Sequence, residues 1–264
     1  MKSLLISASV AFFLMSCNTK SDNGVSFNLS PKEGKGIIKT QEFVKDFDEI
    51  KVAQSISAEV VKSDVEKVVI SAPSDIIDDV LVENNNGKLY IHFKPNMNIS
   101  ARNVAAKIFA KDFSKIEASS SADIKIKDKF TQDKTDVEVS SSAEISGDLE
   151  ANDLSIEVSS SGTFSGQIWA VNLNSEVNSS GEITVSGKTK NAGIEASSSG
   201  TFNAQHVVAE KAEIEASSSG SVSVSVSRQL NASASSSGDI SVARKGNLNI
   251  ITQKESSGGS ISIH

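Results

Sequence analysis

The sequence IEVSSSGTF, at residues 156–164, returns seven more times along the chain with small changes. The other copies are IEASSSADI at 116–124, VEVSSSAEI at 137–145, SEVNSSGEI at 175–183, IEASSSGTF at 194–202, IEASSSGSV at 214–222, ASASSSGDI at 232–240 and a degenerate KESSGGSI at 254–261. The small residue after the serines marks each copy, at Ala122, Ala143, Gly162, Gly181, Gly200, Gly220, Gly238 and Gly258, with steps of 21, 19, 19, 19, 20, 18 and 20 residues. Repetition at such a period predicts a solenoid, whose units bury their apolar faces only by stacking.

Within one copy, apolar or small residues alternate with polar ones. Ile156, Val158 and Phe164 fall on one parity, and Glu157 falls on the other. A period of two is typical of a strand with one buried face. The same parity predicts an inward serine in each copy, at Ser120, Ser141, Ser160, Ser179, Ser198, Ser218 and Ser236. We expect these serines to form a ladder at a turn, partly satisfied by backbone groups.

The glycine of the repeat has two interpretations. It could occupy a corner that needs an unusual φ, or a tight interior position without room for a Cβ. Ala122 and Ala143 at the same place favour the second interpretation. Elsewhere, Phe130, Phe164 and Phe202 are predicted core residues, and Asn86-Gly87 within 80–95 predicts a β-hairpin.

The N-terminus has the features of an export signal: Lys2, a short apolar run and then Ser16-Cys17. The apolar run is shorter than the roughly 20 residues that span a bilayer. Leu14 to Cys17 looks like a bacterial lipobox, and Cys17 is the chain's one cysteine, so we predict lipidation at Cys17. The alternative is an ordinary cleaved signal peptide with a chance cysteine.

These features divide the chain into four parts. We predict a lipoprotein signal peptide at 1–16, a flexible tether at 17–42, an N-terminal β part at 43–115 made of irregular coils or a capping sheet, and a Ser/Gly-repeat β-solenoid at 116–264. The predicted fold class is all-β, with parallel pairing from coil to coil.

A family resemblance rests on the order of three segments: FDEIKVAQSISAEVV, then VVISAPSDIIDDVLVENNNGKLYIHF, then FSKIEASSSADI with its repeats. This order resembles the putative autotransporter adhesin, head GIN domain family, over about residues 43–245. The resemblance implies a right-handed β-helix-like fold in secreted or lipid-anchored bacterial proteins. It brings no catalytic residues.

Composition and motifs limit the ligands and reactions that this sequence predicts. The net charge of −7 argues against a nucleic-acid partner, which favours basic surfaces. We find no zinc spacing, no nucleophile elbow and no remaining thiol nucleophile, so the sequence predicts no metal site, no cofactor and no enzyme. Trp169 is the one candidate for stacking a sugar ring, although a core or cap role is the simpler interpretation.

An acidic residue recurs at one outward position, at Glu117, Glu138, Glu157, Glu176, Glu195 and Glu215. Stacked coils would align these carboxylates about 4.8 Å apart. The row is either a cation-binding strip or a soluble face that prevents sheet aggregation. We expect Lys125, Lys127, Lys188 and Lys190 to offset part of its charge.

Three functions fit this sequence. The first is a non-enzymatic envelope solenoid that acts in adhesion or envelope interaction. It would be attached to the membrane by its lipid and would bind a glycan or protein ligand. The second is a carbohydrate-active enzyme on a β-helix, which requires paired carboxylates in a cleft. The third is a carbohydrate- or peptide-binding module of a larger envelope system. Asn18 after the cysteine predicts the outer membrane, facing either the periplasm or the cell surface.

Overall fold

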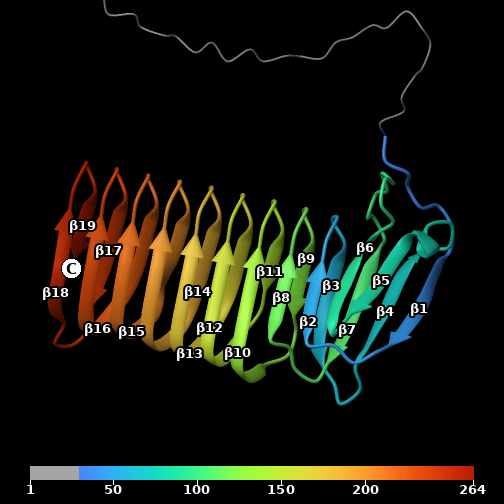
Figure 1. Cartoon of the computed structure of the whole chain (residues 1–264), viewed down its shortest axis with the longest axis horizontal. Coiled ribbons are helices and arrows are strands. Elements are labelled where there is room, and N and C mark those ends of the chain that lie inside the picture. Colours follow the sequence, from blue (N-terminus) through green and yellow to red (C-terminus); the bar gives the residue numbers. More distant parts are fainter. Residues whose placement is uncertain (1–29) are drawn as a thin grey trace, which may run out of the picture. The chain divides into compact units, whose positions relative to one another are not determined.

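The computed structural model describes residues 30–264, of which Pro31–His264 form one compact unit. This unit is a β-solenoid, as predicted, and its coils succeed one another along the long axis in Figure 1. The repeat strands are β8 (Lys115–Ala118), β9 (Asp123–Ile126), β10 (Phe130–Val139), β11 (Glu144–Ser146), β12 (Leu149–Val158), β13 (Thr163–Val177), β14 (Glu182–Ala196), β15 (Thr201–Ala216), β16 (Ser221–Ala234), β17 (Asp239–Arg244), β18 (Asn249–Glu255) and β19 (Ser260–Ile263). No helix in the described part of the chain is long and apolar enough to cross a membrane.

Each coil has three parts in succession. A strand of the first wall leads into the serine turn, a strand of the second wall follows, and a return segment leads back to the first wall of the next coil. Neighbouring coils pair in parallel along all three parts. In the pairing of β12 with β13, for example, Glu157 lies opposite Glu176, and in that of β13 with β14, Phe164 lies opposite Ile183. The sequence period of 19 residues is therefore the length of one coil in this region.

The serine turn is a tight reversal with two consecutive left-handed residues. In the copy at 156–164, Ser160 and Ser161 have φ values of 50° and 61°, and the Gly162 N–H donates to the Ser159 carbonyl at 2.9 Å. This is the geometry of a type I′ turn, which usually contains Asn and Gly because each left-handed residue costs about 1–2 kcal/mol. Here the Ser161 N–H donates to the Ser179 carbonyl of the next coil at 3.1 Å, and equivalent bonds join the other turns. This backbone ladder offsets part of the strain.

The predicted inward orientation of the serines is wrong. Ser160 and its equivalents are exposed at the tips of the turns. The prediction failed because Ser160 and Ser161 form the turn and do not belong to a strand. The alternation of buried and exposed residues in the first wall therefore stops before them. The ladder exists, but backbone groups form it.

The glycine that follows each turn is buried and has an ordinary φ. A Cβ on Gly200 would lie 2.5 Å from the Val177 carbonyl oxygen of the preceding coil, and one on Gly220 would lie 2.3 Å from that of Ala196. Lack of room therefore explains this position, as the interpretation from Ala122 and Ala143 predicted. The last copy needs a correction, because Gly259 occupies the tight position and Gly258, with φ of 79°, replaces a turn serine.

The core lies between the walls and consists of ladders of aliphatic and phenylalanine side chains that run from coil to coil. Phe130, Phe164 and Phe202 are buried, as predicted. One ladder of the second wall contains Ile124, Ile145, Phe164, Ile183, Phe202, Val222 and Ile240. Each coil thus covers the apolar side chains of its neighbour, which is the source of solenoid stability.

The N-terminal end has a different topology, and its spatial order departs from its chain order. The strands are β1 (Ile38–Val44), β2 (Glu49–Val52), β3 (Ser57–Lys62), β4 (Lys67–Pro73), β5 (Val80–Asn85), β6 (Lys88–Phe93) and β7 (Ala105–Ala110), with the 3₁₀ turn η1 (Ile77–Asp79). The coil of β2 and β3 lies between β6 and β7 on one side and β8 and β9 on the other, all in parallel. Beyond it, β5 pairs with β6, and β1 and β4 extend from β7, all antiparallel. These antiparallel strands cap the solenoid (Figure 1). The hairpin predicted at Asn86-Gly87 joins β5 to β6, as expected.

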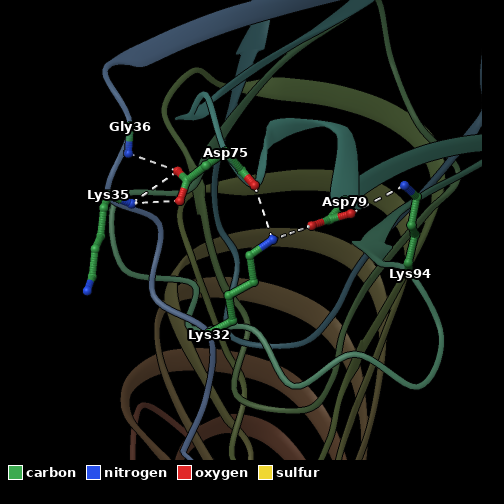
Figure 2. Close-up of polar contacts among 6 residues, drawn as sticks. All are labelled: Lys32, Lys35, Gly36, Asp75, Asp79 and Lys94. Carbon is green, nitrogen blue, oxygen red and sulfur yellow. Dashed lines mark hydrogen bonds and ion pairs between the residues drawn. The ribbon is translucent and has the colours of Figure 1, made fainter.

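A set of polar contacts, which we call the cap clasp, ties residues 32–36 to the connection between β4 and β5 (Figure 2). The Asp75 carboxylate accepts hydrogen bonds from the backbone N–H groups of Lys35, at 3.0 and 3.1 Å, and Gly36, at 2.8 Å. Lys32 Nζ donates to the Asp75 carbonyl at 3.1 Å and lies 3.2 Å from Asp79, which also pairs with Lys94 at 3.3 Å.

These contacts affect both carboxyl groups. The two backbone N–H donors lower the pKa of Asp75. Burial opposes ionisation of Asp79, but the ammonium groups of Lys32 and Lys94 outweigh it and lower the pKa of that carboxyl. The clasp and strand β1 also correct the predicted tether of 17–42, since residues 31–42 belong in part to the cap. The hydrogen bonds of the clasp join residues about 40 positions apart in the sequence, and no local sequence pattern predicts them.

Candidate functional site

The glutamate row forms as the sequence predicted. Strand pairing places Glu117, Glu138, Glu157, Glu176, Glu195 and Glu215 opposite one another in successive coils of the first wall. Lys51 continues the row at its N-terminal end. The parallel register thus creates a line of carboxylates on one face.

The lysines that neutralise this row are not the ones expected. Lys51 pairs with Glu117, Lys115 pairs with Glu138, and Lys88 Nζ lies 3.6 Å from Glu117. Partial burial opposes the charge on Lys115, but its hydrogen bond to Glu138 and the attraction of nearby glutamates outweigh this effect and raise its pKa. Of the lysines expected to help, Lys125 pairs with Asp123 instead. Within residues 30–264, the C-terminal half of the row has no ion pairs.

The C-terminal half of the glutamate row, which has no ion pairs among residues 30–264, borders a shallow hollow of about 380 Å³ that Gly193 helps to line. Gly193 belongs to the row of residues next to the glutamates and has no side chain to fill this space. Carboxylates of Glu157, Glu176, Glu195 and Glu213 surround it. Among the described residues, no group of three His, Cys, Asp or Glu side chains has the geometry to hold a metal ion. The row therefore lies open to solvent without a metal-binding arrangement.

Trp169 lies on a different surface, in the return segment of β13. Strand pairing places Glu150 of the preceding coil and Lys188 of the following coil on either side of it, and Val208 lies beyond Lys188. Trp169 is 37% exposed, so it is not a core residue. Within the part of the chain that the structure describes, its indole N–H has no hydrogen-bond acceptor.

Three surface hollows meet at Trp169, and we call this surface the Trp169 site. The hollow on the N-terminal side, of about 660 Å³, contains mainly acidic and amide side chains: Asp48, Asp112, Gln132, Asp133, Glu150 and Asn152. Its one basic side chain, Lys134, pairs with Asp136. The hollow on the C-terminal side, of about 500 Å³, contains mainly basic and apolar side chains and one carboxylate: Val171, Lys188, Lys190, Val208, Arg228 and Glu210. A third hollow, of about 480 Å³, contains Lys129, Glu150 and Lys188.

An amide ladder beside Trp169 holds the return segments in register. Asn172 donates to Asp153 at 2.6 Å, and Asn191 donates to Asn172 at 2.8 Å. Asn152 donates likewise to Asp133 at 2.9 Å. Because these polar side chains bond along the stack, the surface around Trp169 is fixed by the scaffold rather than carried by a loop.

The sequence identified Trp169 but assigned Lys188 and Lys190 to the glutamate row, whereas both lysines line the hollow beside Trp169. Lys188 is 19 residues further along the chain, one coil length, so adding the repeat period to 169 would have found it. Cys17, the predicted lipidation site, lies outside the described residues.

The comparisons with known proteins agree with this architecture. A family model described as putative auto-transporter adhesin, head GIN domain, matches residues 46–246. The chain belongs to this family. Membership confirms the resemblance seen in the repeats and indicates a bacterial cell-envelope or surface protein. No curated protein sequence matches the chain.

Solved structures share the fold at low sequence identity. A putative lipid binding protein from Parabacteroides distasonis has a TM-score of 0.80 and 24% identity, covering 89% of this chain and 100% of that one. A putative adhesin from the same organism has a TM-score of 0.80 and 19% identity, with 89% and 100% coverage. A putative adhesin from Parabacteroides merdae has a TM-score of 0.77 and 18% identity, with 88% and 98% coverage. These similarities establish the β-solenoid fold.

Proposed function

We propose that this protein is a non-enzymatic adhesin of the bacterial outer membrane, anchored by a lipid at Cys17, whose Trp169 site binds a ligand. Family membership supports adhesion in general. The observation that carries the proposal is the exposed Trp169 side chain, which lies between surface hollows on a rigid wall of paired strands. Binding sites combine an apolar or aromatic surface with a few fixed polar groups, and this surface has both.

The arrangement of carboxylates supports binding without catalysis. The largest set, the glutamate row, is a line along the solenoid rather than a facing pair across a cleft. Glycoside hydrolysis needs two carboxyl groups that flank one bond. Incubation of the full chain with a panel of polysaccharides tests this part of the proposal, and release of reducing ends would contradict it.

Replacement of Trp169 tests the binding site directly. We expect Trp169→Ala to lower adhesion of the protein, displayed on cells that lack their own copy, to host matrix and to glycan-coated surfaces. Trp169→Phe should retain part of the adhesion, because it keeps an aromatic ring. The matched control is Val65→Ala, which removes another exposed apolar side chain, located in the cap. Equal adhesion of Trp169→Ala and wild-type cells would exclude this site.

Anchoring and location need a separate measurement. Mass spectrometry of the N-terminal peptide of the membrane-extracted protein should find acyl chains on Cys17. Protease treatment of intact cells should then remove the solenoid, as expected for an outward-facing adhesin. Full protection would place the protein in the periplasm and argue against adhesion.

A further inference from the structure

The two sides of the Trp169 site along the solenoid axis carry opposite charge. On its N-terminal side, Asp48, Asp112 and Asp133 contribute carboxylates to the hollow. On its C-terminal side, Lys188, Lys190 and Arg228 contribute three cationic groups to one hollow. Of these, only Arg228 has an ion pair within residues 30–264, with Glu210 at 3.4 Å, and its side chain is 73% exposed.

This basic cluster departs from the rest of the molecule. The chain carries a net charge of −7, and the carboxylates of the first wall dominate the neighbouring face. Glu210 lies in the same hollow and offsets the charge of Arg228, but Lys188 and Lys190 remain unpaired within residues 30–264. These two ammonium groups repel each other, and an anionic ligand would relieve that repulsion. The apolar side chains Val171 and Val208 lie in the same hollow and continue the apolar surface of Trp169.

The backbone of this surface limits the kind of partner. Strands β12, β13 and β14 are hydrogen-bonded on both sides throughout the return segments. A peptide that binds by adding a strand needs a free sheet edge, which the Trp169 site does not offer. A chain of sugar rings needs a stacking surface and scattered hydrogen-bonding groups. Trp169 supplies the first. Thr131 and the side-chain oxygens of Asn152 and Ser227 supply the second, since those two side chains donate within the protein but their oxygens accept no hydrogen bond from residues 30–264.

Resting on the function proposed above, we propose that the ligand is an anionic polysaccharide that carries uronate or sulfate groups. One sugar ring packs on Trp169, and the indole N–H donates to a hydroxyl of the sugar. The anionic groups of the following rings lie against Lys188 and Lys190. The carboxylates of the N-terminal hollow repel the same anionic groups, so the charged rings extend from Trp169 toward β14 and β15 and not toward the N-terminal hollow.

Binding of polygalacturonate and of neutral dextran to the full soluble chain, measured by biolayer interferometry at several salt concentrations, tests this proposal. We expect the wild type to bind polygalacturonate, with an affinity that falls as salt rises. Lys188→Ala combined with Lys190→Ala should weaken that binding about tenfold, equivalent to about 1.4 kcal/mol, and should flatten its salt dependence. Lys125→Ala combined with Lys254→Ala removes the same charge from other faces and should leave the binding unchanged.

The outcomes separate this inference from the proposed function. If Trp169→Ala weakens adhesion but polygalacturonate does not bind, the ligand class is wrong and the site stands. The same holds if the Lys188 and Lys190 double variant binds like the wild type, or if the Trp169 site prefers dextran, an acidic peptide or vesicles of anionic lipid. If Trp169→Ala leaves adhesion and all binding intact, the site itself fails. Circular dichroism and thermal melting establish that each variant is folded.

Discussion

The cap and the repeat body of this solenoid are stabilised in different ways. In the body, β10 to β17 pair in parallel, the turns bond to one another through backbone groups, and equivalent side chains lie in ladders. In the cap, strands run antiparallel, and single side chains such as Asp75 make bonds that occur once. A substitution in the body therefore disturbs a contact shared with both neighbouring coils, whereas one in the cap disturbs a local contact.

The largest effect should come from removing a ring from the core of the body. Phe202 is 1% exposed and packs between Ile183 and Val222 of the adjacent coils. Phe202→Ala should lower the free energy of unfolding by about 3–5 kcal/mol, measured by urea denaturation, because neither neighbour can fill the cavity. Asn203→Ala, on the exposed face of the same strand, should change it by less than about 0.5 kcal/mol. Similar losses for both variants would show that the coils do not share a packed core.

A smaller effect is expected at the tight position after the serine turn. A methyl group on Gly220 would lie 2.3 Å from the Ala196 carbonyl oxygen, so the two coils must separate to admit it. Gly220→Ala should lower the free energy of unfolding by about 1–3 kcal/mol in the same assay.

The reverse substitution at the equivalent position is the control. Ala143→Gly keeps the backbone and removes a methyl group that already fits, so its loss should be the smaller one, about 0.5–1 kcal/mol. If Ala143→Gly destabilises the protein more than Gly220→Ala does, spacing between the coils does not limit this position.

The same contrast explains what the sequence could predict. The alternation of Ile156, Val158 and Phe164, repeated at a fixed period, was sufficient to predict the fold class and the core of the body. This is because stacked copies bury equivalent residues, so the pattern of one copy applies to the others. It was insufficient for Ser160, because a two-residue turn interrupts the alternation. The insertion of β2 and β3 between later strands has no counterpart in sequence order.

The candidate site shows the same limit. Trp169 was recognisable as the chain's one tryptophan, but its exposure depended on the return segment, which is less regular than the serine phrase. The glutamate row was predicted from the period alone, while its partners Lys51 and Lys88 come from β2 and β6, outside the repeats. Positions that recur in every copy could be predicted, whereas contacts made by a residue that occurs once, including Lys115 with Glu138, could not.

The smallest effect concerns the cap clasp, where the carboxylate of Asp75 is exposed and its bonds stay within the cap. Asp75→Ala removes the acceptor, so it should release the backbone at Lys35 and Gly36 and leave the unfolding of the body almost unchanged. The wild-type contact also depends on pH. Because the folded pKa lies below the usual value of 3.8, the clasp contributes its full stability above about pH 3.8 and loses it as the pH falls through the lower folded value.

NMR spectra of the backbone amides measure this loss one residue at a time. The Lys35 and Gly36 resonances of the wild type should shift in acid, whereas those of Asp75→Ala should already lie at the released position at neutral pH. The control is Asp78→Ala, which removes a carboxylate from the adjacent η1 turn that accepts a hydrogen bond from Gln41 and none from Lys35 or Gly36. Its spectra should follow the wild type. Unchanged Lys35 and Gly36 amides in Asp75→Ala would mean that β1 and its pairing with β4 hold this segment without the clasp, and the cap would then be stabilised by strand pairing, as the body is.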